Sequence, residues 1–334
     1  MRKHLIIFLY NLYFLIVNVY FLINKLYFKS SKYLYNDINE NKASLNNRKT
    51  IKIDCIDLYQ NQCLCEKLAQ HLGNKFIFKY NTTNPDYILY NSFGSSHLNI
   101  KYKNCVKISY YTENQLPDFN FPDYSIGFYH VKHLDKYFTI PWYLMIRINE
   151  TLYKTIRDKV LISPKRTKFC AAVISDPLGN FRNLFIEELN RYKKVDMGGS
   201  FKNNVGGKVK NKISFLEDYK FSIAMENSEA DGYTSEKIHE SFISGTIPIY
   251  FGNYLVDEFY NPKSFILVKG EKDIKEKIEY IKRIDNNDDL YEEYLKTNIL
   301  VDPSKTQIIY QRELAKFFSH IFSQKKLNAY RNYE

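Results

Sequence analysis

Short apolar runs separated by polar breaks recur along the first half of this chain. Four of them, at residues 51–58, 75–80, 86–90 and 106–111, have the length and the β-branched and aromatic content of strands. Residues 63–72 lie between the first two runs and have the apolar spacing of a helix. Strands that alternate with helical segments predict an α/β protein with a parallel sheet.

The second half repeats this alternation with a clearer period. Residues 169–174, 219–225 and 247–251 read as buried strands, and residues 180–191 and 235–244 as amphipathic helices. In parallel sheets the carboxyl ends of the strands lie at one edge, where ligands bind. Polar residues that directly follow these strands are therefore the first candidates for a functional site.

The amino terminus has a different pattern. Residues 5–23 are dominated by apolar side chains, and their length matches the hydrocarbon core of a bilayer. A cleaved signal peptide would have a shorter apolar region and a small-residue cleavage site, and no such site follows Ile23. The prediction is an uncleaved signal-anchor in a single-pass membrane protein, type II, with a Golgi- or ER-like lumenal domain if the cell is eukaryotic. Both flanks are basic, so charge does not set the orientation.

Together these patterns predict two α/β domains behind a membrane anchor. The predicted divisions are a short tail at residues 1–4, the anchor at 5–23, a polar stem at 24–50, a first α/β domain at 51–155, a second α/β domain at 156–290, and a helical tail at 291–334.

The formal net charge of +11 allows two interpretations, a nucleic-acid or acidic membrane partner, or a groove for an anionic sugar nucleotide. No nucleic-acid-binding motif is recognisable, and the lysines are spread along the whole length. We therefore expect no nucleic-acid partner. The charge is compatible with a nucleotide-diphosphate ligand.

The densest group of chemically capable side chains lies in residues 219–253. It follows a predicted strand and leads into a predicted helix, whose first N–H groups and positive dipole favour an anion such as phosphate. The group consists of Glu226, Asn227, Tyr233, Glu236 and Lys237.

This stretch closely resembles the donor-binding motif of the α1,3/4-fucosyltransferases, glycosyltransferase family 10. Residues 225–228 read MENS, residues 232–238 read GYTSEKI, and residues 248–252 read PIYFG. Two departures are mild, because Met225 replaces a usual Phe and Ser235 replaces a usual Thr but keeps the hydroxyl. The resemblance implies a GT-B-like fold, with two Rossmann-like domains facing a cleft, and GDP-fucose as the donor.

The resemblance continues upstream of that motif. Residues 168–177 look like the strand that opens the donor domain, and residues 181–185, FRNLF, look like the start of the helix that follows it. Arg182 in this helix could bind a diphosphate through two parallel hydrogen bonds. Residues 195–200, VDMGGS, resemble a glycine loop of the family, which makes Gly198, Gly199 and the nearby Asn204 further donor-binding candidates; a plain glycine-rich turn is the alternative.

In the first half, residues 110–114, YYTEN, resemble a segment whose glutamate is the family's proposed general base. Glu113 directly follows an apolar strand, so it is expected at the carboxyl edge of the first sheet. A carboxylate partly buried in a dry cleft holds a proton more tightly, which suits it to deprotonate an acceptor hydroxyl. A turn carboxylate that accepts backbone hydrogen bonds is the alternative interpretation.

The resemblance implies transfer of fucose from GDP-fucose, with inversion, to a hydroxyl of a glycan acceptor such as O3 of GlcNAc or glucose. Lys237 and Arg182 would stabilise the diphosphate, Glu236 would bind sugar hydroxyls, and Asn227, Tyr233 and Glu226 would line the pocket. No Asp-x-Asp sequence occurs in the chain, which favours metal-free donor binding, although a divalent cation could still aid turnover. The open alternatives are a glycosyltransferase for another nucleotide sugar, a non-catalytic GDP-sugar-binding protein, and a membrane scaffold.

Overall fold

The computed structural model describes residues 48–57, 72–73, 75–80, 83–131, 133–139, 158, 166–302 and 307–331, with side chains from residue 312 in the last range. The predicted anchor at residues 5–23, the stem up to residue 47 and nearly all of the helical candidate at 63–72 lie outside these ranges. Among the helices within them, none combines the length and the hydropathy that crossing a membrane requires.

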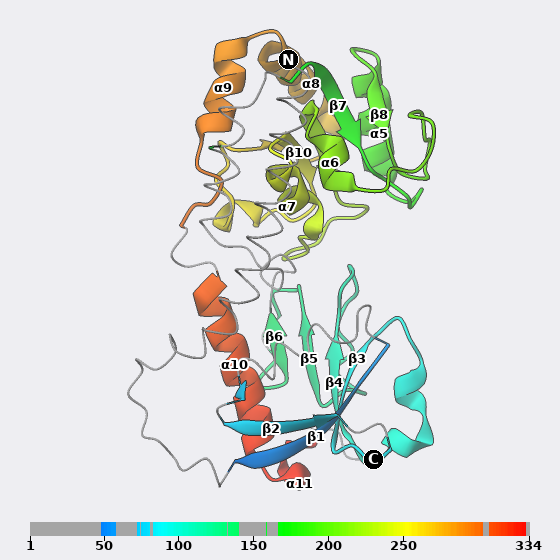
Figure 1. Cartoon of the computed structure of the whole chain (residues 1–334), viewed down its shortest axis with the longest axis vertical. Coiled ribbons are helices and arrows are strands. Elements are labelled where there is room, and N and C mark those ends of the chain that lie inside the picture. Colours follow the sequence, from blue (N-terminus) through cyan, green and yellow to red (C-terminus); the bar gives the residue numbers. More distant parts are fainter. Residues whose placement is uncertain are drawn as a thin grey trace, which may run out of the picture. The chain divides into compact units, whose positions relative to one another are not determined.

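The first half forms a six-stranded sheet in which every ladder is parallel. Its strand order is β2-β1-β3-β4-β5-β6 (Figure 1). Two short 3-10 helices, Ser96–Leu98 and Ile100–Tyr102, follow the third strand. The strands are β1 Lys49–Ile56, β2 Phe76–Tyr80, β3 Tyr87–Asn91, β4 Val106–Tyr110, β5 Tyr124–Gly127 and β6 Tyr137–Thr139.

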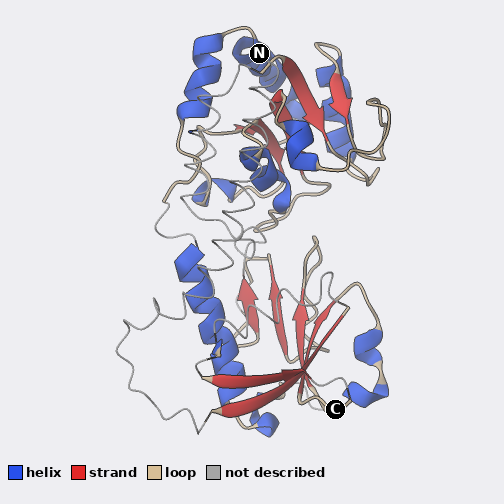
Figure 2. Ribbon diagram, in the orientation of Figure 1, coloured by secondary structure: helices blue, strands red, loops and turns tan. Residues whose placement is uncertain are grey.

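The second half forms a five-stranded parallel sheet of order β11-β10-β9-β7-β8, accompanied by helices (Figure 2). Its strands are β7 Lys168–Ala172, β8 Val195–Met197, β9 Tyr219–Met225, β10 Ile247–Phe251 and β11 Ile266–Leu267. Its helices are α5 Asn180–Asn190, α6 Lys212–Leu216, α7 Glu236–Ile243, α8 Ile274–Asp285 and α9 Asp288–Lys296.

Strand β9 lies in the middle of the second sheet and is buried along its whole length. Its side chains alternate between two hydrophobic clusters, as strand geometry requires. Phe221, Ile223 and Met225 pack in the cluster that includes α5 and α8, whereas Ala224 packs in the cluster that includes α7. Helices therefore cover both faces of the sheet, which explains why the strand reads as a continuous apolar run.

The carboxyl-terminal part of the chain packs on the first sheet. Helix α10, Gln307–Ser323, buries Phe318, Ile321 and Phe322 in the cluster that holds the first sheet's core. The Phe322 ring meets Tyr87 of β3 edge to face at 5.0 Å between centroids. The short helix α11, Lys326–Ala329, follows it. The helical character of this region was predicted, but its return to the first sheet was not.

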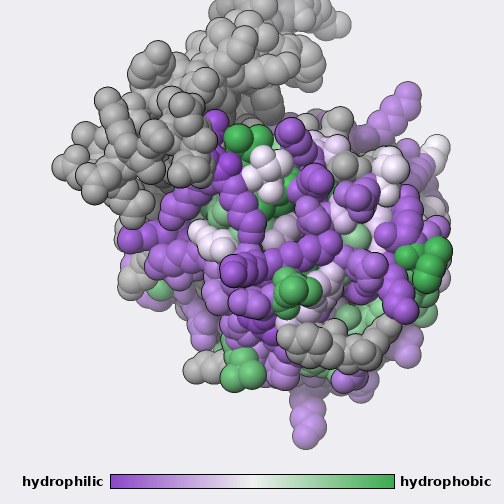
Figure 3. Space-filling view, turned by 90° about the horizontal axis from the view of Figure 1, so that it is seen from below, coloured by the Kyte–Doolittle hydropathy of each residue, from purple (hydrophilic) through white to green (hydrophobic). Residues whose placement is uncertain are grey.

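The predicted strands, and the two helices predicted at residues 180–191 and 235–244, agree with the observed ones within two residues at each end, which confirms the α/β prediction. The prediction missed β5, β6, β8 and β11, which are four, three, three and two residues long. Runs this short have no measurable period. Seen from the end of the first sheet, the described surface is mostly hydrophilic, with apolar side chains in small separate patches (Figure 3).

Candidate active site

The topology of the second sheet marks one place for a ligand. The chain runs from β7 outward to β8, then crosses back to β9 and continues to β10 and β11 on the other side. The loops that leave the carboxyl ends of β7 and β9 therefore diverge, and open parallel sheets bind ligands in the crevice at such a switch point. The loop after β9 carries residues 226–235, and the loop after β7 leads into α5 with Arg182.

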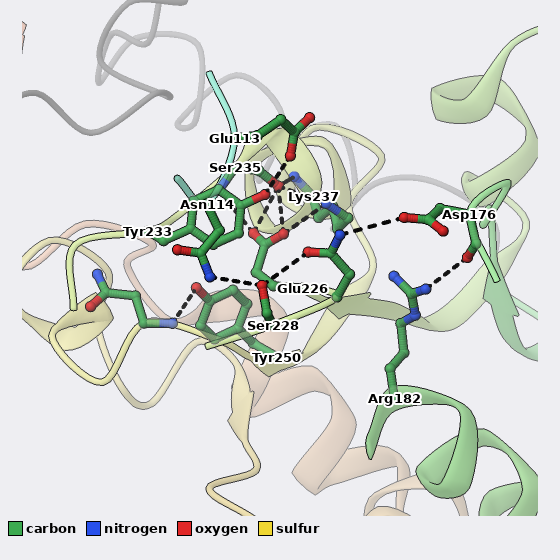
Figure 4. A network of polar contacts seen from close by, with 12 residues as sticks. Glu113, Asn114, Asp176, Arg182, Glu226, Ser228, Tyr233, Ser235, Lys237 and Tyr250 are labelled. Carbon is green, nitrogen blue, oxygen red and sulfur yellow. Dashed lines mark hydrogen bonds and ion pairs between the residues drawn. The ribbon is translucent and has the colours of Figure 1, made fainter. Parts of the chain in front are cut away.

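A buried carboxylate organises the loop after β9 (Figure 4). Glu226 directly follows the strand and is 0 % exposed. It accepts hydrogen bonds from the backbone N–H of Ser235 at 2.8 Å and from the Ser235 hydroxyl at 2.7 Å, and it pairs with Nζ of Lys237 at 2.7 Å. At this burial the carboxylate is closed off from solvent, and its ion pair fixes the position of Lys237.

Gly252, after β10, leaves room for this carboxylate. A Cβ at this position would lie 2.6 Å from Cγ of Glu226 and 2.9 Å from the hydroxyl of Tyr250. Its φ of 150° is also one that side-chain-bearing residues rarely adopt. The glycine of the PIYFG run is therefore required by packing at the site.

Lys237 lies in the first turn of α7, where Ser235 is the N-cap residue. Burial opposes its charge, but the carboxylates of Glu226 and Glu236 outweigh burial and raise the pKa of the ammonium group. Burial likewise opposes ionisation of Glu236, but Lys237, Lys212 and local hydrogen bonds together outweigh it and lower the pKa of that carboxyl group. Both groups are therefore charged at neutral pH, at a helix amino terminus that itself favours an anion.

Arg182 lies at the helix start where it was predicted, and its role as a donor ligand stays a prediction. It lies in the first turn of α5, but it is only 2 % exposed, and its Nη2 donates to the backbone carbonyls of Asp176, at 2.9 Å, and Leu178. Burial lowers the pKa of its guanidinium, which stays charged in proteins. The guanidinium thus holds the loop after β7, and its Nε has no hydrogen-bond partner among the described residues.

Asn227 joins the two diverging loops. Its Nδ2 lies 3.5 Å from Oδ2 of Asp176, and its Oδ1 accepts a long hydrogen bond from the hydroxyl of Ser228 at 3.4 Å (Figure 4). Asp176 was not singled out in the sequence. The only feature of the sequence that could have pointed to Asp176 was that it lies within residues 168–177, the segment that resembles the opening strand of the family's donor domain.

The glycine loop has a local structural explanation. A Cβ at Gly199 would lie 1.8 Å from the carbonyl oxygen of Ile174, so the two backbones pack directly on each other. Gly198 lies instead against the side chains of Val209 and Phe215, and a Cβ there would come within 2.9 Å of each. The Asn204 side chain accepts from the backbone N–H of Met197 at 2.8 Å and donates to the carbonyl of Val195 at 3.0 Å. These contacts explain why the loop has Gly198, Gly199 and Asn204 at these positions even if none of them binds a ligand.

Glu113 lies after β4 and meets the loop after β9. The hydroxyl of Tyr233 donates to Oε2 of Glu113 at 2.9 Å, and Nδ2 of the adjacent Asn114 donates to the Ser228 hydroxyl at 2.7 Å (Figure 4). Tyr233 is 1 % exposed, whereas Glu113 is exposed, contrary to the predicted partial burial. The structure therefore brings the predicted base to the predicted donor site. Asn114 was missed because nothing marked it except its place beside Glu113.

The glycine before Tyr233 makes this contact possible. Gly232 has φ of 88°, and a Cβ there would lie 2.0 Å from the carbonyl oxygen of Phe128, which follows β5. Its N–H donates to the side chain of Asn253 at 2.9 Å, and the Phe128 ring meets the Tyr233 ring edge to face at 5.5 Å. The GY pair of the motif therefore packs on the carboxyl edge of the first sheet.

Asp123, a carboxylate ten residues after Glu113, lies at the amino end of its strand and not at the carboxyl end. It directly precedes β5, is 2 % exposed, and accepts from the backbone N–H groups of Lys107 at 2.8 Å and Arg331 at 2.7 Å. It holds backbone at the amino edge of the first sheet, opposite to the carboxyl edge where Glu113 lies.

The site thus combines fixed positive charge with an accessible carboxylate. Lys237 and the first turn of α7 are suited to a diphosphate, and Glu113 is suited to accept a proton from an attacking hydroxyl. Within the described ranges, no group of three or more His, Cys, Asp or Glu side chains could hold a metal ion.

Comparison with known proteins agrees with this chemistry. The family model "Glycosyltransferase family 10 (fucosyltransferase) C-term" matches residues 163–330, about half of the chain, and the model of the "Alpha-(1,3)-fucosyltransferase FucT N-terminal domain" matches residues 53–146. The chain belongs to glycosyltransferase family 10.

Individual relatives point the same way. The chain is 33 % identical over 272 residues to the alpha-(1,3)-fucosyltransferase FucT of Helicobacter pylori, which covers 71 % of this chain but only 57 % of that enzyme. It is 35 % identical over 100 residues to GDP-fucose protein O-fucosyltransferase 3 of Gallus gallus, which covers 30 % of this chain and 21 % of the relative.

Solved structures confirm the fold. An alpha1,3-fucosyltransferase crystallised with GDP-fucose superimposes with a TM-score of 0.69 at 26 % identity, over 86 % of this chain and 94 % of that one. The glycosyltransferase HepE of Anabaena, at 8 % identity and a TM-score of 0.51, shares the fold alone. The fold is thus the two-sheet GT-B type expected for the family.

Proposed function

We propose that this protein is a fucosyltransferase that transfers fucose from GDP-fucose to a hydroxyl group of a glycan. The observation that carries the proposal is the contact between Tyr233 and Glu113, because it joins a base candidate to a loop built for a diphosphate. Family membership supports fucose as the transferred sugar and GDP as the nucleotide.

In the proposed reaction, the acceptor oxygen attacks the anomeric carbon of fucose. The bond from that carbon to the β-phosphate oxygen breaks, its electron pair leaves with GDP, and the configuration inverts. Glu113 accepts the acceptor's hydroxyl proton. The growing charge on GDP is stabilised by Lys237 and by the N–H groups that begin α7, with Arg182 supporting the neighbouring loop.

The acceptor is proposed to be a glycan, with O3 of GlcNAc or glucose as the attacking group. The match of residues 53–146 to the amino-terminal domain of an alpha-(1,3)-fucosyltransferase supports this choice, because that region carries Glu113. The similarity to a protein O-fucosyltransferase covers only 30 % of the chain.

The test is release of the nucleoside diphosphate, GDP or UDP, by the full-length protein in detergent. GDP-fucose, GDP-mannose, UDP-galactose and UDP-GlcNAc are each offered with a panel of glycans ending in GlcNAc or glucose and with an unglycosylated peptide. GDP release from GDP-fucose that depends on a glycan supports the proposal. Release of a nucleoside diphosphate from another donor would indicate a different glycosyltransferase. Tight binding of GDP-fucose without turnover would indicate a binding protein.

Metal dependence is tested in the same assay. We propose that the charge of Lys237 suffices for donor binding, so EDTA leaves GDP-fucose affinity unchanged. A divalent cation is expected to speed turnover only through GDP release. Loss of GDP-fucose binding in EDTA, restored by Mn²⁺ or Mg²⁺, would contradict this part of the proposal.

We further propose that residues 5–23 anchor the enzyme in a membrane as a single-pass, type II protein. Their apolar length supports it. Deletion of residues 1–30 is expected to convert a detergent-requiring protein into one that remains active in buffer. A full-length protein that stays in buffer without detergent, with its amino terminus intact, would contradict the anchor.

A further inference from the structure

We propose that the amino edge of the first sheet is a docking surface for a bilayer that contains acidic phospholipids. At this edge the six parallel strands begin, so it lies opposite to the carboxyl edge that carries Glu113. The inference goes beyond the proposed transfer reaction. It rests on the proposed anchor at residues 5–23 only in that the anchor keeps a membrane nearby.

The excess positive charge of the described residues belongs to one part of the chain. Residues 166–302, which contain the second sheet and Lys237, have 20 lysines and arginines against 23 aspartates and glutamates. The described residues among 48–139 and 312–331, which contain the first sheet, have 14 against eight. The excess therefore lies outside the part that carries the proposed donor loop.

Within the part that contains the first sheet, this excess gathers at the amino edge. Nine of the 14 basic side chains lie there, against three of the eight acidic ones, and the rest of this part has five of each. Six of the nine precede a strand by one to three residues or are one of its first two residues: Arg48, Lys49, Lys75, Lys103, Lys107 and Lys136.

The end of the chain brings the other three basic side chains to the same edge. Nζ of Lys326 lies 3.1 Å from Oδ1 of Asp86, which directly precedes β3. The backbone N–H of Arg331 donates to Asp123, which directly precedes β5, at 2.7 Å. The packing of α10 and α11 on the first sheet thus places Lys325, Lys326 and Arg331 among the strand starts.

The three acidic groups of the edge leave most of this charge uncompensated. Asp123 is 2 % exposed and binds backbone N–H groups, whereas Asp86 and Asp135 are paired with Lys326 and Arg331. The side chains of Lys75, Lys103 and Lys325 are exposed, and their ammonium groups have no hydrogen-bond partner among the described residues. Each lysine near an acidic bilayer favours the docked state about fivefold, so a few of them suffice.

The edge also carries features that suit an interfacial layer of lipid. Leu134 is 90 % exposed two residues before Lys136, and Leu327 is 76 % exposed directly after Lys326. Exposed leucines among lysines can enter the headgroup region while the ammonium groups meet phosphates. A pocket of about 460 Å³, lined in part by Lys49, Lys325 and Lys326, offers a recess for one headgroup.

The path of the chain favours a bilayer as the partner of this edge. Arg48 directly precedes β1, so the proposed stem joins the protein at the amino edge. Docking there would turn the carboxyl edge away from the membrane. The five residues of β4 span about 17 Å, which separates Glu113 from the lipid by at least the length of a strand.

The principal test uses the unaltered full-length protein reconstituted into vesicles. One set is phosphatidylcholine alone, and the other contains about 30 % phosphatidylglycerol. A water-soluble acylating reagent labels exposed amines from outside, and mass spectrometry reads each lysine. Lys75, Lys103 and Lys325 should react at least about threefold more slowly in the acidic vesicles. Salt at about 1 M, where the screening length is about 3 Å, should abolish the difference.

The matched controls are three lysines of the same molecule, Lys263, Lys272 and Lys275. They are also exposed, but they lie near β11 and the start of α8 in the other part of the chain. Their reactivity should be equal in the two kinds of vesicle. Normalising to them corrects for molecules whose folded part faces the vesicle interior.

A charge-reversal variant tests the cause of the protection. Lys75→Glu, Lys103→Glu and Lys325→Glu together should remove the protection of Lys49, which remains at the same edge. Lys263→Glu, Lys272→Glu and Lys275→Glu together change the net charge equally and should leave that protection intact. Both variants alter only exposed side chains, so each should keep the wild-type Tm.

Equal reactivity of Lys75, Lys103 and Lys325 in the two kinds of vesicle overturns the proposal, as does protection that survives the charge reversal. Protection of equal size in neutral vesicles would indicate a contact with protein, such as a second copy of this chain, and overturns it too. Failure of the proposed anchor looks different, since the wild-type protein would then not sediment with neutral vesicles. Failure of the proposed transfer reaction would leave the lysine reactivities unaffected.

Discussion

Two loops at the carboxyl edges of the two sheets each carry a carboxylate, and they hold it in opposite ways. After β9, Glu226 is fully buried and paired with Lys237 only 11 residues further along the chain. After β4, Glu113 is exposed, and the group that holds it, Tyr233, lies 120 residues away in sequence. The loop proposed to bind the donor is thus built locally, whereas the loop proposed to carry the base is completed by contact between distant segments.

The two carboxylates also differ in the free energy that holds them in place. A buried ion pair costs desolvation of both charges, and removing one partner leaves the other uncompensated. Glu226 and Lys237 are therefore a rigid unit, prepared for an anion before the anion binds. The Glu113 carboxylate stays in solvent, where it can exchange protons, and relies on one hydrogen bond for its position.

The largest expected effect is on the acceptor side. Glu113→Gln keeps the shape of the side chain but cannot accept a proton, so kcat should fall about 10²- to 10⁴-fold with little change in GDP-fucose affinity. Steady-state kinetics and calorimetry measure the two quantities. The exposed, ion-paired Glu187 offers the control Glu187→Gln. Near-normal turnover of Glu113→Gln would assign the base elsewhere.

The next effect is on the donor side. Lys237→Ala should weaken GDP-fucose binding about 10- to 100-fold, because a charge-assisted contact to phosphate is lost. It also leaves Glu226 buried without its counter-charge, so a lower Tm is expected. Lys282→Ala removes a lysine with the same 2.7 Å separation from its glutamate, Glu279, on α8, and should change neither quantity. Donor affinity unaltered by Lys237→Ala would remove this lysine from the site.

A third substitution tests whether the loops after β4 and β9 affect turnover and donor binding separately. Gly232→Ala places a Cβ against the Phe128 carbonyl in a backbone conformation that alanine disfavours, a strain of about 1–3 kcal/mol. Relief of that strain should move Tyr233 away from Glu113 and lower kcat more than donor affinity. Gly270→Ala is the control, because its Cβ would meet nothing within 4 Å. Equal losses of kcat and of GDP-fucose affinity would show that the loops do not separate.

The locality of each contact explains what the sequence could predict. The Glu226–Lys237 unit lies within one strand–loop–helix segment, so the periodicity and the motif at residues 219–253 placed its members near one another. The contacts of Glu113 depend on how the loops after β4 and β9 meet, and no local pattern contains that information. The resemblance supplied Glu113 as a candidate, but the exposure of its side chain required the structure.

The burial of Arg182 was missed for a similar reason. A guanidinium at the start of a helix suggests a phosphate ligand, and that role stays a prediction. The sequence did not show that the loop carbonyls of Asp176 and Leu178 also accept hydrogen bonds from it. Whether a side chain meets backbone or ligand depends on the path of a loop. The short strands β5 and β8 and the docking of α10 on the first sheet likewise follow from tertiary packing.

The smallest expected effect tests whether the first sheet's stability is separable from its site. Asp135, between β5 and β6, binds Arg331 and also His320 of α10 at 2.8 Å, and the hydrogen bond from Arg331 is the main cause that lowers the pKa of the Asp135 carboxyl to about 2. Because the folded-state pKa lies below the ordinary value of 3.8, the contact stabilises the fold above about pH 4 and is lost as pH falls toward 2. The carboxylate is 38 % exposed, so solvent limits its contribution to about 1 kcal/mol or less.

Asp135→Asn should therefore lower Tm by about 2–4 °C or less near pH 7, with a gap that narrows as the pH falls below 4. GDP-fucose affinity and kcat should stay unchanged, because the contact holds α10 and the chain's end on the first sheet and touches neither loop of the site. Asp257→Asn, which removes an exposed carboxylate beside the second sheet, should show no such gap. Thermal unfolding at several pH values measures both. A Tm gap that persists unchanged at pH 3 would mean that the charge of Asp135 is not what stabilises the fold. A loss of turnover at pH 7 would mean that docking of α10 and the position of Glu113 are coupled through the first sheet.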